Sequence, residues 1–416
     1  MKIALIAEHT NPLSAHKGEP TCGESVHISA ISRHLAKRGH RVTVFSRRNA
    51  PDLPDRSRMG RGVNVEHIAA GPESAVTADR AADHTGAFAT ALKDRLVDSG
   101  PDVVHAFGWT SGLAALSAAR DTRENGSAPP IVQTFHSLNV AEQRAGLPKY
   151  PDRARMEAAI AGRADAIVVN SADQRFELAR MGVPRGRVSV VPFGVDTDHF
   201  SVEGSTTAEP WHSRRGERTR IISVTGLASG SGADVLIEAL TRLPDAELAI
   251  VADPAPVELA LDEDAGRLKF LAKEAGVDDR VTLTGPIDRK ELPKLLRSAD
   301  VYVSAAPYDP YGGAVLEAMA CGLPIIGKAS GSIPGAVLHG TTGVLLRSVG
   351  PNTIARALHG LTSSGSTMRA AYGIAGADRA ESRFTWQRVA AETERVYAHA
   401  CPQEDALPLA AGDDAH

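Results

Sequence analysis

The chain has 416 residues, 43% of them hydrophobic and 23% charged, a composition typical of a globular protein whose length predicts two or three domains of roughly 150 residues each. The formal net charge of −4 gives no bulk positive field to hold nucleic acid, and no apolar run approaches the ~18 residues of a membrane span. We therefore expect a cytoplasmic protein, and its three scattered cysteines indicate neither a disulfide framework nor a cysteine-rich zinc site.

The chain opens with a pattern that predicts a strand, a loop and a helix. Residues 2–9 form a short aliphatic run, and an amphipathic stretch follows at residues 26–38. Gly39 ends this helix and residues 42–45 supply the next strand, which makes a βαβ unit and a parallel sheet. Further strands of this first series are expected at residues 63–68, 102–107, 131–135, 166–170 and 188–192.

A second series follows a polar stretch without apolar periodicity at residues 201–218, which we interpret as a linker. Its strands are expected at residues 220–226, 247–253, 280–285, 300–307 and 324–327. Two doubly wound α/β domains at residues 1–200 and 219–385 would hold a ligand between the carboxyl ends of their strands, in a central cleft. We expect the last helix, at residues 386–400, to return to the N-terminal domain, and the tail at residues 401–416 to be disordered.

One long segment resembles a known family signature. PYDPYGGAVLEAMACGLPIIG at residues 307–327 is similar to the signature of the retaining glycosyltransferases of family four, which have the GT-B fold, with Asp309 and Glu317 as its two acidic residues. Further matching segments extend the likeness over roughly residues 1–400. These segments lie at residues 7–13, 34–48, 101–116, 133–138, 188–200 and 383–386. The chain looks most similar to actinobacterial members of the mycothiol and antibiotic pathways.

The resemblance implies two Rossmann-like domains and a specific reaction. The N-terminal domain would bind a small polar acceptor, and the C-terminal domain would bind a UDP- or GDP-sugar. Transfer would need no metal and no cofactor besides this donor. The pattern says nothing of the oligomeric state.

The acidic pair and its surroundings provide the first donor-binding candidates. By the resemblance, Glu317 would bind the ribose, and Asp309, one methylene shorter than the family's usual glutamate, would act near the sugar hydroxyls. A charge near a helix terminus for Glu317 and a turn for Asp309 are the simpler alternatives. Further candidates at the start of the following helix are Gly312, Gly313, Ala314 and Leu316. Ile287 lies in the loop expected to bind the base. Gly23 lies in the N-terminal glycine loop, where Cys22 replaces a glycine.

The strongest departure from the family concerns the leaving diphosphate. The family's neutralising Arg and Lys are replaced by Gly226 and Ser231. A Gly/Ser-rich turn stands there instead and opens onto a helix, so its backbone amides are candidates to hold the phosphates: Ser229, Gly230, Ser231 and Gly232. Lys328 or Arg289 would then supply part of the missing positive charge.

Histidines and acidic residues that follow strands provide the acceptor-side candidates. His105 stands where the family has the first of two histidines, with Phe107 in place of the second, so we predict a catalytic role for His105 and keep a packed histidine as the alternative. The acceptor candidates are Glu8, His9, Asn11 and His136. Asp196 and Asp198 form a DxD pattern that we interpret as a helix cap, and we predict no metal.

Two hypotheses remain beside sugar transfer to a hydroxyl. The absence of the family's two cations and second histidine is consistent with a catalytically silent GT-B protein that has a role in binding or assembly. Thiolates need less help from a base than hydroxyls do, so S-glycosylation of a low-molecular-weight thiol is a second acceptor chemistry.

Overall fold

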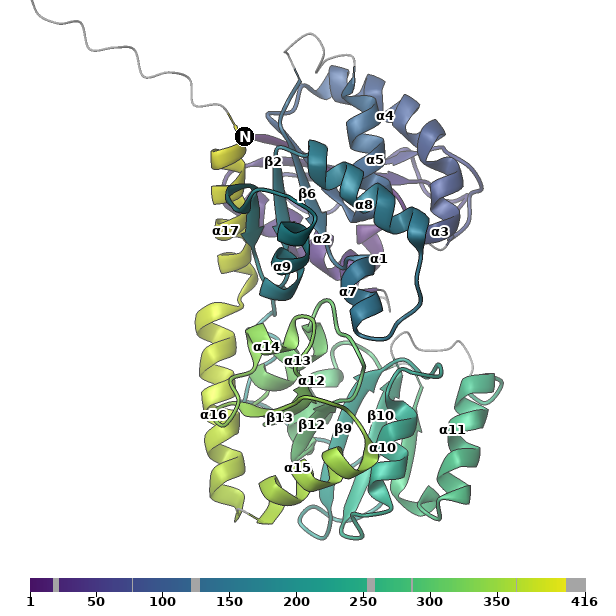
Figure 1. Cartoon of the computed structure of the whole chain (residues 1–416), viewed down its shortest axis with the longest axis vertical. Coiled ribbons are helices and arrows are strands. Elements are labelled where there is room, and N and C mark those ends of the chain that lie inside the picture. The colour runs from purple at the N-terminus through teal and green to yellow at the C-terminus, as the bar shows by residue number, and fades with distance from the viewer. Residues whose placement is uncertain are drawn as a thin grey trace, which may run out of the picture.

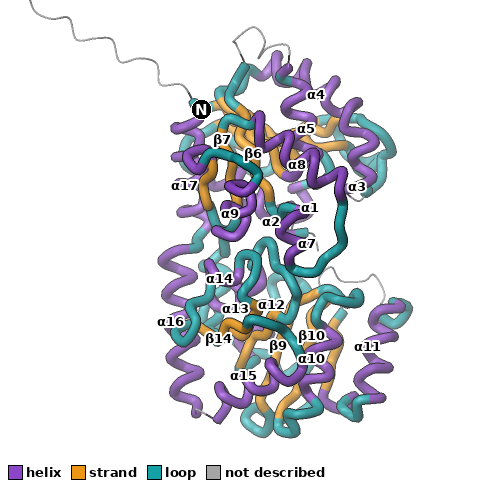
Figure 2. The backbone as a smooth tube through the Cα atoms, viewed as in Figure 1, coloured by secondary structure: helices purple, strands orange, loops and turns teal. Residues whose placement is uncertain are grey.

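The computed structural model describes residues 1–17, 22–76, 78–120, 128–252, 259–285, 287–363 and 365–401. These residues form two sheets, each surrounded by helices, in two lobes (Figure 1). Figure 2 shows the strands of both lobes at the centre, with helices outside them. Residues 402–416 of the predicted disordered tail and Asp253 of a predicted strand lie outside the described residues.

The first sheet has eight strands in the order β3-β4-β2-β1-β5-β6-β7-β8, and only β3 runs antiparallel to its neighbour. Its strands are β1 (Lys2–Ala7), β2 (Arg41–Arg47), β3 (Arg56–Arg58), β4 (Val63–Ile68), β5 (Val103–Phe107), β6 (Ile131–Phe135), β7 (Ala166–Val169) and β8 (Val188–Val190). The central strands β5 and β6 are buried along their whole length because helices cover both faces, as in other parallel sheets. All seven predicted strands of this series are confirmed.

The helices of this lobe include α2, which forms one wall of the cavity described below. The described helices are α1 (Pro12–Lys17), α2 (Gly23–Lys37), α3 (Ala78–Ala81), α4 (Thr85–Ser99), α5 (Gly108–Ala118), α7 (Asn139–Arg144), α8 (Pro151–Arg163) and α9 (Ala172–Arg180). Gly39 follows the end of α2 with φ +94°, a left-handed conformation that favours glycine, so its predicted role as a stop is confirmed.

The second sheet has six parallel strands in the order β11-β10-β9-β12-β13-β14. They are β9 (Thr219–Thr225), β10 (Ala246–Ala252), β11 (Val281–Thr284), β12 (Val301–Ser304), β13 (Ile325–Lys328) and β14 (Gly343–Leu346). Its helices are α10 (Ala233–Leu240), α11 (Glu263–Glu274), α12 (Leu292–Ser298), α13 (Gly313–Ala320), α14 (Ile333–Ala336), α15 (Pro351–Ser363) and α16 (Gly365–Arg383). The five predicted strands are found, and β14 was not predicted. Within the described part of the chain, no helix is long and apolar enough to cross a membrane.

The polar stretch at residues 201–218 lies against the second sheet. The Trp211 indole donates to the Ser298 hydroxyl at 2.8 Å, and the Arg220 guanidinium stacks over the Trp211 ring. The buried Glu247 carboxylate accepts backbone N–H groups from His212 and Ser213. These contacts anchor the stretch to the C-terminal lobe.

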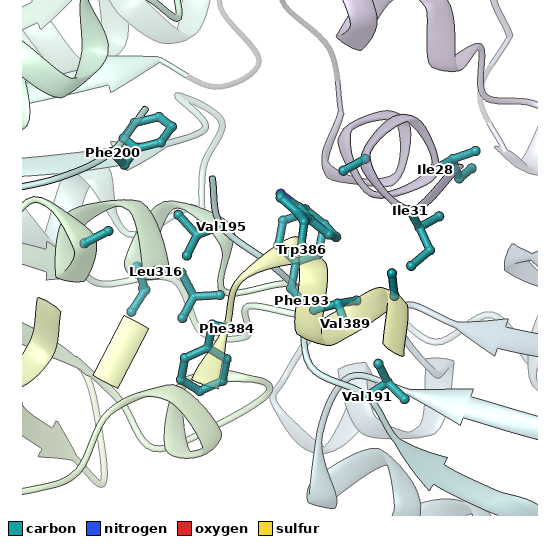
Figure 3. Packing of buried hydrophobic residues seen from close by; sticks show 14 of the residues in the cluster. Ile28, Ile31, Val191, Phe193, Val195, Phe200, Leu316, Phe384, Trp386 and Val389 are labelled. Carbon is teal, nitrogen blue, oxygen red and sulfur yellow. The ribbon is translucent and has the colours of Figure 1, made fainter. Parts of the chain in front are cut away.

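The chain passes between the lobes at two adjacent places. Val195 pairs with Thr385, and the Val195 N–H donates to the Phe384 carbonyl at 2.8 Å. Beside this pair, the rings of Phe193 and Trp386 pack edge to face in one apolar cluster that continues into both lobes (Figure 3). The last helix, α17 (Trp386–Ala400), then runs along the N-terminal lobe and packs against α2 (Figure 1).

Candidate active site

A cavity of about 510 Å³ lies between the two lobes. One wall is the face of α2 that carries Gly23, Val26 and Ala30, and the crossing segment closes it with Phe193 and Trp386. The opposite wall is formed by the carboxyl ends of β9, β10 and β12 and by the start of α13. Ligands bind at this edge of parallel α/β sheets, so the cavity is the candidate active site.

Eight of the residues predicted to contact the donor or its sugar line this cavity. They are Gly23, Gly226, Ile287, Arg289, Asp309, Gly313, Ala314 and Glu317. Because they come from both lobes, a ligand there would contact the N-terminal glycine loop and the acidic signature together. The structure therefore brings these predicted candidates together around one cavity.

Glu317 lies in the second turn of α13 and is ion-paired. Its carboxylate accepts a hydrogen bond from the Arg289 guanidinium, which also stacks over the Phe200 ring at 5.1 Å. The side chain of Glu317 is largely buried, yet it borders the cavity. Arg289 therefore fixes the carboxylate that we expect to meet the ribose.

Asp309 shapes the loop that leads into α13. Its carboxylate accepts the backbone N–H groups of Tyr311 at 3.0 Å and Gly312 at 2.7 Å. Enclosure raises the pKa of Asp309, and these two hydrogen bonds act in the opposite direction. The turn-forming role is thus visible in the structure, whereas the predicted role near the sugar remains a prediction.

The Gly/Ser-rich turn stands behind the cavity wall. Thr225 donates its hydroxyl to the Ser231 carbonyl at 3.1 Å, and a Cβ at Gly232 would overlap the Ala305 carbonyl, which belongs to a lining residue. None of the turn residues Ser229, Gly230, Ser231 and Gly232 lines the cavity itself. The predicted phosphate contact with this turn therefore has no support from the geometry.

Three further donor candidates also do not line the cavity. Gly312 and Leu316 belong to the start of α13, where Gly312 has φ +69° as the residue before the helix. The Lys328 ammonium donates to the Pro307 carbonyl at 2.7 Å. This hydrogen bond holds the Lys328 ammonium against the loop, away from the cavity in which the diphosphate is expected.

The acceptor candidates surround a second, buried polar cluster with Glu24 at its centre. The Glu24 carboxylate lies 3.1 Å from Nδ1 of His136 and 3.7 Å from Nε2 of His9, and it accepts the Thr10 hydroxyl at 2.9 Å. Burial opposes ionisation, but these partners outweigh it and lower the pKa of Glu24 to about 2. Nε2 of His136 is 3.0 Å from Nδ1 of His27. Sequence reasoning missed Glu24, which no pattern marked.

Glu8 and Asn11 lie beside this cluster in local roles. Glu8 is buried and accepts the Thr85 hydroxyl, and burial raises its pKa. The Asn11 side chain accepts the Leu13 N–H at 3.0 Å. None of the four predicted acceptor residues lines the cavity.

Tyr311 separates the cavity from the acceptor cluster. Its ring lies 5.1 Å from the His136 ring and 5.6 Å from that of Phe193, measured between centroids. A Cβ at Gly23 would lie 3.1 Å from the Tyr311 ring. A side chain of the acidic signature thus reaches from the C-terminal lobe to the N-terminal one.

His105 is buried away from the cavity. Its Nδ1 lies 2.7 Å from the Tyr397 hydroxyl and its Nε2 lies 2.6 Å from the Thr134 hydroxyl. Its ring stacks on Phe107 at 4.3 Å, and burial lowers the pKa of His105 to about 3. The geometry is that of the packed alternative, and the predicted catalytic role has no structural support.

Further charged or titratable residues of the lining lie on α2 and at the crossing. Arg33, His34 and Lys37 line the cavity from α2. Asp196 and Asp198 line it from the crossing segment, where the Asp196 carboxylate accepts the N–H of Asp198 at 3.2 Å within a turn that no helix follows, so the predicted helix cap is wrong. Among the described residues, no three His, Cys, Asp or Glu side chains are arranged to hold a metal ion.

Two family models match the chain in succession. The model described as Glycosyltransferase Family 4 matches residues 22–199, and the model described as Glycosyl transferases group 1 matches residues 206–379. The D-inositol 3-phosphate glycosyltransferase of Nocardiopsis dassonvillei is 30% identical over 99% of this chain and 97% of its own length. The same enzyme from Xylanimonas cellulosilytica is 30% identical over 97% of this chain and 98% of its own length.

Solved structures show the same arrangement of lobes. Sucrose-phosphate synthase from Thermosynechococcus elongatus has a TM-score of 0.82 at 24% identity, covering 96% of this chain and 98% of its own. Anabaena HepE in complex with UDP and glucose has a TM-score of 0.71 at 17% identity, covering 96% and 100%. At these identities the likeness is one of fold.

Proposed function

The chain belongs to the family four glycosyltransferases with the GT-B fold, and from that premise we propose that it moves a sugar from a nucleoside diphosphate to a small polar acceptor. The donor would lie over the second sheet, with its ribose near Glu317 and its base near Ile287. The acceptor would approach from the first sheet, where His9, Glu24 and His136 lie together.

The observation that carries this proposal is that one cavity brings the two lobes together. Gly23 of the first lobe and Gly226, Gly313 and Glu317 of the second lobe line the same space. In the reaction, the bond from the sugar C1 to the acceptor atom forms while the bond from C1 to the phosphate oxygen breaks. The diphosphate leaves with that electron pair, and the acceptor loses its proton. Charge therefore develops on the diphosphate, which is where a site must stabilise it.

The relatives suggest the first acceptor to test. Two of them are named for D-inositol 3-phosphate, so a phosphorylated cyclitol is the first acceptor class for this chain. A low-molecular-weight thiol is the second, because a thiolate is nucleophilic without a strong base. Such an acceptor would need less help from a basic residue than a hydroxyl does.

Mass spectrometry of reaction products tests the proposal. The protein is incubated with UDP- and GDP-sugars against a panel of cyclitols, their phosphates and thiols. A product whose mass equals that of the acceptor plus the sugar minus one water is expected for at least one pair. The matched control is Glu317→Ala, which should lower product formation. A donor that raises the melting temperature without any product over the whole panel would instead support the silent binding protein.

A further inference from the structure

On the donor side of the cavity, the only cation among the described lining residues is Arg289, and it is already paired with a carboxylate. The positions where the family resemblance places Arg and Lys hold Gly226 and Ser231. Of the two replacements considered, Lys328 donates to the Pro307 carbonyl and Arg289 is paired with Glu317. A diphosphate bound here would therefore need cations from elsewhere in the cavity wall.

Helix α2 supplies two such cations. Gly23, Val26, Ala30, Arg33 and Lys37 are spaced by three or four residues, so they lie on one face of the helix, and all five line the cavity. Ile28 and Ile31 turn instead toward the apolar core (Figure 3). The cavity face of α2 thus changes from small residues at its start to two positive charges near its end.

The charges of Arg33 and Lys37 are available to a ligand. Both side chains are exposed, and among the described residues neither forms an ion pair with a carboxylate; Arg33 donates only a 3.3 Å hydrogen bond to the Ser29 carbonyl. Burial first, and then the charges of Lys37 and Arg33, lower the pKa of His34 to about 4, while Asp196 and Asp198 act in the opposite direction. Arg33 and Lys37 thus place two positive charges at the cavity, which Asp196 and Asp198 partly offset.

We infer that Arg33 and Lys37 of α2 bind the donor diphosphate from the N-terminal lobe and take the place of the cationic pair that the second sheet lacks. This inference rests on the proposed function. Positive charge on the opposite wall also links the leaving group to domain closure, because a diphosphate bound to the second sheet would attract α2. Two long cationic side chains four residues apart on one helix face can contact the same anionic group.

Isothermal titration with UDP, GDP and UMP tests this inference. Arg33→Ala and Lys37→Ala should each raise the dissociation constant of the diphosphate that binds by about threefold to tenfold, as expected for an ion pair that becomes partly buried on binding. The double variant should lose more, and raising the salt concentration should weaken wild-type binding more than binding by the double variant. UMP, which lacks the second phosphate, should lose less affinity than UDP does.

Arg41→Ala is the matched control, because Arg41 is exposed on β2 and does not line the cavity. Its affinity should equal that of the wild type, and melting temperatures of all variants establish that they are folded. If both single variants and the double variant bind the diphosphate with the affinity of the wild type, this inference alone is overturned. Failure of both UDP and GDP to bind the wild-type protein would overturn the proposed function and this inference together.

Discussion

The Tyr397 hydroxyl lies 2.7 Å from Nδ1 of His105, and this hydrogen bond joins the last helix of the chain to the central strand β5. Both side chains are fully buried. Since a buried polar group that loses its partner is costly, the pair stabilises the attachment of α17 to the N-terminal lobe.

Tyr397→Phe should lower the free energy of unfolding by about 1 kcal/mol or somewhat more, because His105 would keep its ring in place but lose one partner. Urea unfolding followed by circular dichroism measures this. Tyr150→Phe, at an exposed position, should change stability by less than about 0.5 kcal/mol. Equal stabilities of the Tyr397 variant and the wild type would show that the hydrogen bond contributes nothing.

Glu317→Ala should weaken binding of the free nucleoside diphosphate more than His105→Ala does, because only Glu317 borders the cavity. A lost charge-assisted hydrogen bond costs roughly 1.5 to 3 kcal/mol. Isothermal titration with UDP and GDP decides between the two variants. The assignment fails if Glu317→Ala binds with wild-type affinity.

The contribution of His105 to stability should fall as the pH decreases from about 6.5 toward 3. Burial lowers the pKa of His105 from 6.5 to about 3. In this pH range His105 therefore binds a proton in the unfolded chain but not in the folded chain. Burial also lowers the pKa of His27 well below 6.5, which adds to the loss. Each such site contributes a slope of up to about 1.4 kcal/mol per pH unit. In urea unfolding between pH 7 and 4, His105→Asn should show a shallower slope than the wild type, and an unchanged slope would contradict the assignment.

Gly232→Ala should destabilise the protein more than Gly230→Ala does. Both glycines have positive φ, +96° and +81°, so the backbone strain on substitution is similar. A Cβ at Gly232 would overlap the Ala305 carbonyl, whereas the space at Gly230 is open. The added overlap costs about 1 to 3 kcal/mol. Thermal unfolding of the two variants provides the comparison, and equal melting temperatures would show that the Ala305 contact relaxes without cost.

The strands were predictable where aliphatic runs are long enough to be buried on both faces. β3 and β14 escaped prediction for different reasons. β3 is the three-residue sequence RSR at an edge of the first sheet, so it has no apolar pattern. β14 is the four-residue sequence GVLL at an edge of the second sheet, and most of its residues are half-buried.

Site residues were harder to predict, because a position at the end of a strand does not reveal what covers it. His105 has a partner 292 positions away, in α17. The partnership of Glu317 with Arg289 was equally invisible, since both residues had been considered separately. Arg33 and Lys37, however, continue the three-and-four spacing of Gly23, Val26 and Ala30, and that signal was present in the sequence.

The position of α17 means that the N-terminal lobe is not one continuous piece of chain. A fragment ending at residue 200 would lack the helix that covers α2 and supplies Tyr397, and it would expose the apolar surface around Phe193 to solvent. Adding residues 386–400 as a separate peptide should restore that cover, much as a split protein regains its fold when its pieces associate. Limited proteolysis near residue 385 would likewise cleave the polypeptide chain, and the two lobes would not separate at once.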